Sequence, residues 1–145
     1  MKLATIALSL IALAACQNAT GPAGPPDTSQ SQIDTLVLAP GQEVGVDRLF
    51  RVGFMEVSSD SRCPTDVLCI WAGNAAVEIA LAIGEGPSYP FTLNTFTYPP
   101  ATVDFSGYRV TLLDLTPHPV STTPIQPGDY RAHLQVGRAD STASR

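Results

Sequence analysis

A run of strictly alternating side chains, from Ala75 to Ile83, most tightly limits how this chain can fold. Its odd-numbered positions carry Ala, Val, Ile, Leu and Ile, whereas its even-numbered positions carry Ala, Glu, Ala and Ala. Alternation of this kind is the pattern of a β-strand with one face buried and the other turned away from the core. The run therefore predicts a strand and argues against a helix.

Shorter stretches with the same period occur along the chain, and proline and glycine separate them. We expect these further strands at 33–39, around Val44 and Val46, and at 48–58, 89–98, 103–105, 108–115 and 129–136. Within 48–58 the apolar positions change face after Phe54, so Gly53 is expected to mark a β-bulge, with Met55 and Val57 continuing the apolar face.

Seven or eight short strands in about 105 residues indicate an all-β fold. We predict an antiparallel two-sheet β-sandwich of the immunoglobulin-like kind, or a small barrel, over residues 33–137, followed by a frayed tail at 138–145. The thirteen prolines and eleven glycines agree with many turns and few long helices. A chain of 145 residues is long enough for one such domain.

The first sixteen residues have the layout of a lipoprotein signal. Met1 and Lys2 precede an apolar run at 3–13, which is too short to span a bilayer and fits a secretory signal peptide over 1–15. The tetrapeptide LAAC, ending at Cys16, resembles the lipobox of bacterial lipoproteins. That resemblance implies cleavage before Cys16 and acylation of its thiol, so that lipid chains hold the protein on a membrane. An ordinary signal peptide with a chance cysteine is the alternative.

Residues 17–32, QNATGPAGPPDTSQSQ, are expected to form a flexible tether. They contain no large apolar side chain, so they cannot bury enough surface to offset the entropy of ordering. Gln17 follows the cysteine, and in Gram-negative lipoproteins a residue other than Asp at this position implies the outer membrane. We therefore expect a domain that stands off the outer membrane and faces the periplasm.

Two cysteines remain for the folded domain, Cys63 and Cys69, in the stretch DSRCPTDVLCIWAG at 60–73. An exported domain meets an oxidising compartment, where two cysteines in one small domain most often pair, so we predict a structural disulfide. In the loop-entropy model, closing a loop of seven residues raises the free energy of unfolding by roughly 2.4 kcal/mol. A redox-active pair is less well supported, because such centres usually use C-x-x-C at the start of a helix.

A metal site is the other chemical alternative. Two thiolates with His118 and His133 would match zinc or copper in ligand type. His118 stands between two prolines, however, and His133 falls on the outward face of its strand, so nothing in the sequence brings the four groups together. We predict no metal ligand and no cofactor. The chain also lacks a recognisable nucleophile and base, so we predict that it is not an enzyme.

The remaining candidates lie beside the cysteines. Trp71 is expected to pack in the core against the disulfide, and its alternative role is an anchor for a binding partner. Asp60, Arg62 and Asp66 are expected to form an exposed rim, with Arg62 paired to one of the acids. This rim is the predicted binding surface.

Three segments resemble a family of small exported bacterial lipoproteins that has no established activity. They are DSRCPTDVLCIWAG, GYRVTLLDLTPHP and DYRAHLQV, and the resemblance runs from about residue 36 to residue 136. It is carried by the elements D-S-R-C-P, C-x-W-A-G and L-x-L-x-P. The resemblance implies export, lipid anchoring and a small domain, fits a Cys63–Cys69 pair, and implies no catalytic or binding residue.

These features predict a lipid-anchored, non-enzymatic β-sandwich that binds a protein or another component of the cell envelope. A metal-binding or metal-handling lipoprotein is the alternative. Without Lys2, seven arginines face thirteen acidic residues, a net charge of −6, which gives no sign of a nucleic-acid partner.

Overall fold

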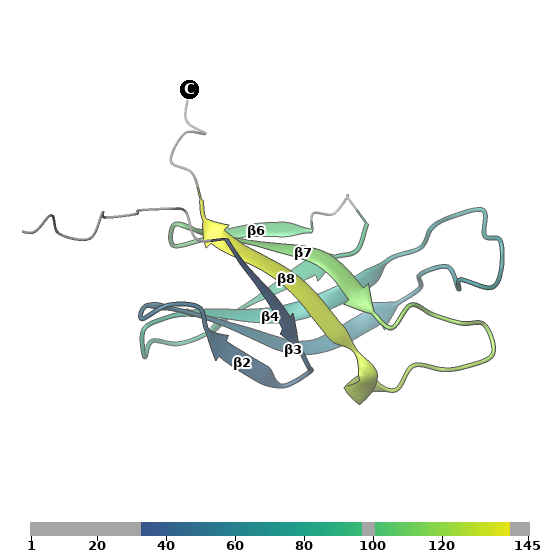
Figure 1. The fold of residues 1–145 in the computed structure, drawn as a ribbon, viewed down its shortest axis with the longest axis horizontal. Helices are drawn as coiled ribbons and strands as arrows, with labels where there is room; N and C mark the ends of the chain where they lie inside the picture. Colours follow the sequence, from purple (N-terminus) through teal and green to yellow (C-terminus); the bar gives the residue numbers. More distant parts are fainter. Residues whose placement is uncertain (1–32, 97–100, 140–145) are drawn as a thin grey trace, which may run out of the picture.

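Two antiparallel four-stranded β-sheets pack face to face in the computed structural model, which describes residues 33–96 and 101–139 (Figure 1). The first sheet has the order β1-β8-β7-β6 and consists of Asp34–Leu38, Arg131–Arg138, Tyr108–Thr116 and Thr102–Phe105. The second has the order β2-β3-β4-β5 and consists of Gln42–Gly45, Phe50–Asp60, Ala75–Ile83 and Tyr89–Asn94. The predicted sandwich is therefore confirmed over the alternative of a small barrel, because the two sheets do not close on each other.

Several predicted segments lie outside the described residues. These are the signal peptide at 1–15, the lipidated Cys16, the tether at 17–32, the end of the expected strand at 89–98, and the tail beyond Ala139. A short 3₁₀ turn, Pro127–Asp129, precedes β8, so this strand begins two residues later than expected and runs on to Arg138.

The alternating run of β4 supplies the centre of the core. Its first four odd-numbered side chains are completely buried, and Ile83 at the strand end is the exception, at 36% exposed. The facing sheet buries alternate residues in the same way, which are Tyr108, Val110 and Leu112 on β7, and Ala132, Leu134 and Val136 on β8. A bulge at Leu113 shifts the next buried position of β7 to Leu115. Period-two patterning therefore places the apolar faces of both sheets against each other.

The face change in β3 comes from a bulge two residues later than predicted. Phe54 pairs with Ile79 and Glu56 pairs with Glu78, so Met55 is the extra residue. Gly53 lies in regular register, and the bulged Met55 is exposed where we expected it to continue the apolar face. One extra residue shifts the alternation, and Val57 is thereby returned to the core, as expected.

An aromatic pair joins the sheets at one end of the sandwich. Phe50 of β3 stacks on Tyr108 of β7, with ring centroids 4.1 Å apart. The Tyr108 hydroxyl donates a hydrogen bond of 2.6 Å to Asp47, in the β2–β3 connection, and the Arg138 guanidinium lies 4.0 Å above the Tyr108 ring. The hydrogen bond from Tyr108 holds the pKa of Asp47 below its usual range, so the carboxylate stays charged.

The two long connections, β3–β4 and β7–β8, leave the sandwich at its other end (Figure 1). Asp60 at the end of β3 accepts a hydrogen bond from Tyr130, which directly precedes β8. The chain enters β1 at the opposite end, because β1 runs antiparallel to β8 and Asp34 pairs with Val136. The segment that leads to residues 17–32 and the β3–β4 loop therefore lie at opposite ends of the domain.

Two leucines on β7 test the core assignment. Leu115→Ala removes a fully buried side chain and should lower the free energy of unfolding by about 3 kcal/mol, because it leaves a cavity between the sheets. Leu113→Ala, at a bulged and half-exposed position of the same strand, should change it by less than about 0.5 kcal/mol. Chemical denaturation measures both, and similar losses in the two variants would contradict the assigned register.

Candidate functional site

The predicted disulfide is present, between Cys63 and Cys69 with Cα atoms 6.0 Å apart. It closes part of the β3–β4 connection, residues 61–74, which we call the disulfide loop. Two backbone hydrogen bonds extend the strand pairing into this loop, from the Ser61 amide to the Asn74 carbonyl at 2.7 Å and from the Cys63 amide to the Ala72 carbonyl at 2.9 Å. The base of the loop is therefore held by the sheet as well as by the disulfide.

Gly73, the last residue of the W-A-G element, is required by the close approach of the two sides of the loop. Its φ of 72° lies in the left-handed region that favours glycine. A Cβ atom at this position would lie 1.9 Å from the Ser61 carbonyl oxygen, far inside van der Waals contact. The two sides of the loop can approach each other this closely only because residue 73 has no side chain.

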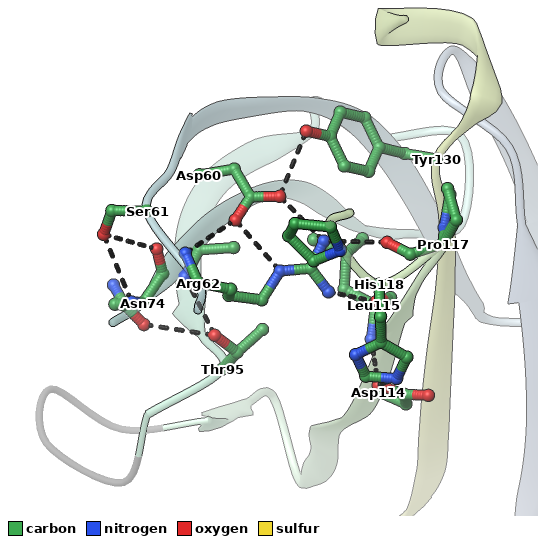
Figure 2. A network of polar contacts seen from close by, with 12 residues as sticks. Asp60, Ser61, Arg62, Asn74, Thr95, Asp114, Leu115, Pro117, His118 and Tyr130 are labelled. Atoms are coloured by element: carbon green, nitrogen blue, oxygen red, sulfur yellow. Dashed lines mark hydrogen bonds and ion pairs between the residues drawn. The ribbon is translucent and has the colours of Figure 1, made fainter. Parts of the chain in front are cut away.

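Asn74 fixes the second side of the loop base (Figure 2). Its side-chain amide donates to the Asn94 side chain at 2.7 Å, and its side-chain oxygen accepts from the Phe96 amide at 3.1 Å. The Ser61 hydroxyl donates to the Asn74 carbonyl at 3.0 Å. These bonds connect the start of β4 to the end of β5 and satisfy the polar groups at this end of the sheet.

Arg62 is the central residue of the site (Figure 2). Its guanidinium donates to both carboxylate oxygens of Asp60, at 2.9 and 2.7 Å, in a bidentate pair. The same group donates to the Leu115 carbonyl and, at 2.9 Å, to the Pro117 carbonyl. The Tyr130 hydroxyl donates to Asp60 at 3.1 Å. We call these residues the Arg62 clamp; they join the end of β3 in one sheet to β7 and the start of β8 in the other.

Arg62 was predicted to pair with one of the nearby acids, and that acid is Asp60. The prediction that both residues are exposed is wrong. The side chains are only 8% and 10% exposed, so neither belongs to an exposed binding rim. Burial alone would raise the pKa of Asp60, yet the hydrogen bonds and charge of Arg62, with a further bond from Tyr130, hold that pKa below its usual value. The pair is a structural connection between the sheets.

Asp66 lies on the surface, as predicted, and also has a structural partner. Its carboxylate accepts hydrogen bonds from the amide and the hydroxyl of Ser121, in the β7–β8 connection, and these bonds hold its pKa below the usual range. The Thr65 amide donates to the Pro119 carbonyl at 2.9 Å. The first half of the disulfide loop is thus attached to the neighbouring connection.

The second half of the loop carries an exposed apolar tip, which we define as Leu68, Ile70 and Trp71. Their exposed fractions are 101%, 94% and 83%. The prediction that Trp71 packs in the core is therefore wrong. Trp71 lies in the connection beyond the end of β3, where it is exposed to solvent instead of lying between the sheets. The alternative role of Trp71, as an anchor for a partner, agrees with its position.

Open grooves flank the base of the loop, and Arg62 lines both of them. One, of about 410 Å³, lies towards the β7–β8 connection, beside Pro64, Ile125 and Tyr130. The other, of about 270 Å³, lies towards the end of β5, beside Phe96 and His118. Both grooves lie at the base of the disulfide loop, and Leu68, Ile70 and Trp71 line neither of them.

The groups of the metal hypothesis do not converge. The disulfide occupies both thiols, His118 lies 3.5 Å from Asp114, and His133 is hydrogen-bonded to Thr116 at 3.1 Å. Within residues 33–96 and 101–139, no three His, Cys, Asp or Glu side chains gather in a way that would hold a metal ion.

Sequence reasoning missed Leu68, Ile70 and Gly73. The sequence did contain a signal for Leu68 and Ile70, because VLCIW at 67–71 is an apolar run without the period-two alternation of the strands, and it spans the second cysteine of the predicted disulfide. Gly73 has no such signal, since its role depends on the path of the Ser61 backbone.

The chain matches no protein-family model, no curated protein and no solved structure. Across the part of the chain that the structure describes, no helix is both long and apolar enough to cross a bilayer.

Replacing the cysteines tests the contribution of the disulfide. Cys63→Ser should lower the free energy of unfolding by about 2.4 kcal/mol, because the unfolded chain regains the entropy of an open loop. Adding Cys69→Ser to that variant should cost little more, since the crosslink is already lost. Chemical denaturation under non-reducing conditions measures the free energy of unfolding of the wild type, Cys63→Ser and the double variant. If adding Cys69→Ser lowers this free energy by as much again as Cys63→Ser does, the two residues act separately.

The Arg62 clamp makes stability depend on pH. The pKa of Asp60 in the folded protein lies below its ordinary value of 3.8, so its contribution is complete above that value and is lost as pH falls through the lower, folded pKa. Arg62→Met leaves a buried carboxylate without its partner and should cost about 3 kcal/mol at pH 7. The difference in the free energy of unfolding between this variant and the wild type should become smaller below pH 3.8.

Arg109→Met is the matched control for Arg62→Met. Arg109 also forms a bidentate pair, with Asp104 at 2.7 Å, but both side chains are about half exposed. Its replacement should cost less than about 1 kcal/mol. If Arg62→Met and Arg109→Met lower the free energy of unfolding equally, the assigned role of the clamp is contradicted. The same holds if the loss caused by Arg62→Met is as large at about pH 3 as at pH 7.

Proposed function

We propose that this chain is a lipid-anchored, non-enzymatic binding module of the bacterial cell envelope. The segment 1–15, the LAAC motif that ends at Cys16 and the tether-like segment 17–32 support an anchored domain that stands off the membrane. In this proposal Cys16 carries the lipid, the outer membrane is the site of attachment, and the disulfide loop contacts an envelope partner.

The exposed apolar tip is the observation that carries the proposal. Leaving Leu68, Ile70 and Trp71 in water forgoes about 1.5–3 kcal/mol for each large apolar side chain that burial would stabilise. Single exposed apolar residues are ordinary, but three within four successive residues of a braced loop are typical of a contact element. Trp is also the residue type most enriched at the energetic centres of interfaces.

The support beneath the tip favours binding for a second reason. The disulfide, Gly73, Asn74 and the Arg62 clamp hold the base of the loop before any partner arrives. A loop that is ordered in advance loses less conformational entropy on association, so more of the burial energy remains as affinity. The alternative of a metal-handling lipoprotein gains no comparable support, because its two thiols form the disulfide.

A variant without the apolar tip tests the proposal. Leu68→Ser, Ile70→Ser and Trp71→Ser together should leave the free energy of unfolding within about 0.5 kcal/mol of wild type, because these side chains contact little of the domain. Binding should weaken by more than about 30-fold, since truncating a central anchor commonly costs about 2 kcal/mol or more. The lipidated chain in lipid nanodiscs serves as bait for envelope extract, and each retained protein is then purified and titrated.

Leu49→Ser is the matched control. Leu49 is 57% exposed and lies at the end of the sandwich away from the disulfide loop, so its replacement should leave binding unchanged. A partner retained equally by the wild type and the tip variant would mean that the disulfide loop is not the contact element.

A further inference from the structure

The position of the tip relative to the membrane anchor limits what the tip can contact. The chain that comes from Cys16 enters the domain at Ile33, beside the end of β8. The disulfide loop leaves from the end of β3, beside the start of β8. An anchored domain therefore carries its apolar tip on the end that is farther from its attachment point (Figure 1).

Chain lengths give this orientation a scale. β3 has eleven residues and spans about 36 Å at roughly 3.3 Å per residue, and the disulfide loop extends beyond it. Sixteen residues separate Cys16 from Ile33, and they reach at most about 55 Å when fully extended. For the tip to enter the bilayer that holds Cys16, the domain must invert and this segment must run back along it, at roughly two thirds of its full length or more.

Charge also disfavours a lipid surface. Loops and helices that bind anionic membranes place Lys or Arg beside their apolar residues. Between residues 60 and 75 the only basic residue is Arg62, and its guanidinium is buried in the pair with Asp60. The exposed charge nearest to the tip in sequence is the carboxylate of Asp66, which its bonds to Ser121 keep ionised.

Shape then indicates the partner. The tip presents two branched aliphatic side chains and an indole with nearly full exposure, and projecting side chains of this kind are complementary to a concave, apolar site in a folded protein. We infer that the disulfide loop inserts Leu68, Ile70 and Trp71 into an apolar cleft of another exported protein, on the side of the domain away from the membrane that holds the lipid anchor. This inference rests on the proposed function and adds the class of partner and the direction of contact.

The first arm of the test uses the fluorescence of Trp71, the only tryptophan in the chain. Lipidated full-length protein is inserted into vesicles of phosphatidylethanolamine and phosphatidylglycerol, with or without brominated acyl chains. The emission of Trp71 should stay that of a water-exposed indole, and bromine should not quench it. A double variant, Gln17→Trp with Trp71→Phe, reports on the anchor itself and should be quenched, because residue 17 adjoins the acylated cysteine.

The second arm uses a photo-crosslinking amino acid in the envelope of intact cells. Placed at Leu68 in the full chain, it should form one discrete protein adduct, which disappears when Ile70 and Trp71 are changed to serine. Placed at Leu49, at the opposite end of the domain, it should not form that adduct.

The outcomes separate the inference from the function on which it rests. An adduct at Leu68 alone, with Trp71 unquenched, supports both. Quenching of Trp71 by brominated lipid overturns the protein partner and leaves the loop as a contact element for membrane. The same adduct at Leu68 and Leu49 overturns insertion of the tip. If Leu68 forms no adduct and brominated lipid does not quench Trp71, the proposed function is contradicted. If the indole of the Gln17→Trp double variant is not quenched, the proposed lipid anchor is contradicted.

Discussion

The hydrogen bonds of the Arg62 guanidinium hold together the end of the domain that carries the disulfide loop. Arg62 lies just after β3, in one sheet, and reaches carbonyl groups at the end of β7, in the other. A buried charge is costly unless its donors find partners, and here Asp60, Leu115 and Pro117 together accept hydrogen bonds from all three guanidinium nitrogens. Tyr130 completes the carboxylate side of the pair. The result closes the open end of a sandwich with polar bonds where the apolar core stops.

The opposite end repeats the same residue types with a different outcome. Asp47 accepts from Tyr108, and Arg138 lies over the tyrosine ring but remains largely exposed. Both ends thus join the sheets through an acid, a tyrosine and an arginine. At the end with Arg62, the clamp holds the base of the long β3–β4 connection, and Leu68, Ile70 and Trp71 stay exposed beyond it. A held base and an exposed tip thus occur in one loop.

Much of the fold could be predicted from the sequence, because burial on one face imposes a period of two that is visible in β4, β7 and β8. Cysteine number and the predicted export signal were enough to predict the disulfide. The bulge at Met55 was misplaced, since register depends on the partner strand. Asp60 and Arg62 were expected on the surface because charged residues usually lie there, and only the fold shows that they bury each other. The prediction for Trp71 was wrong for the converse reason: large apolar residues usually lie in the core, but Trp71 is exposed in the β3–β4 connection.

The placement of chain entry and tip at opposite ends has a mechanical consequence. β1 is the first strand after Ile33 and pairs along its five residues with β8. The hydrogen bonds of this ladder lie perpendicular to the strands. For a domain attached through Ile33 and gripped at Trp71, tension runs along β1 and loads these bonds together in shear, instead of breaking them one at a time. If the proposed anchor and partner are present, the terminal strand is oriented to carry force between them without peeling from its sheet.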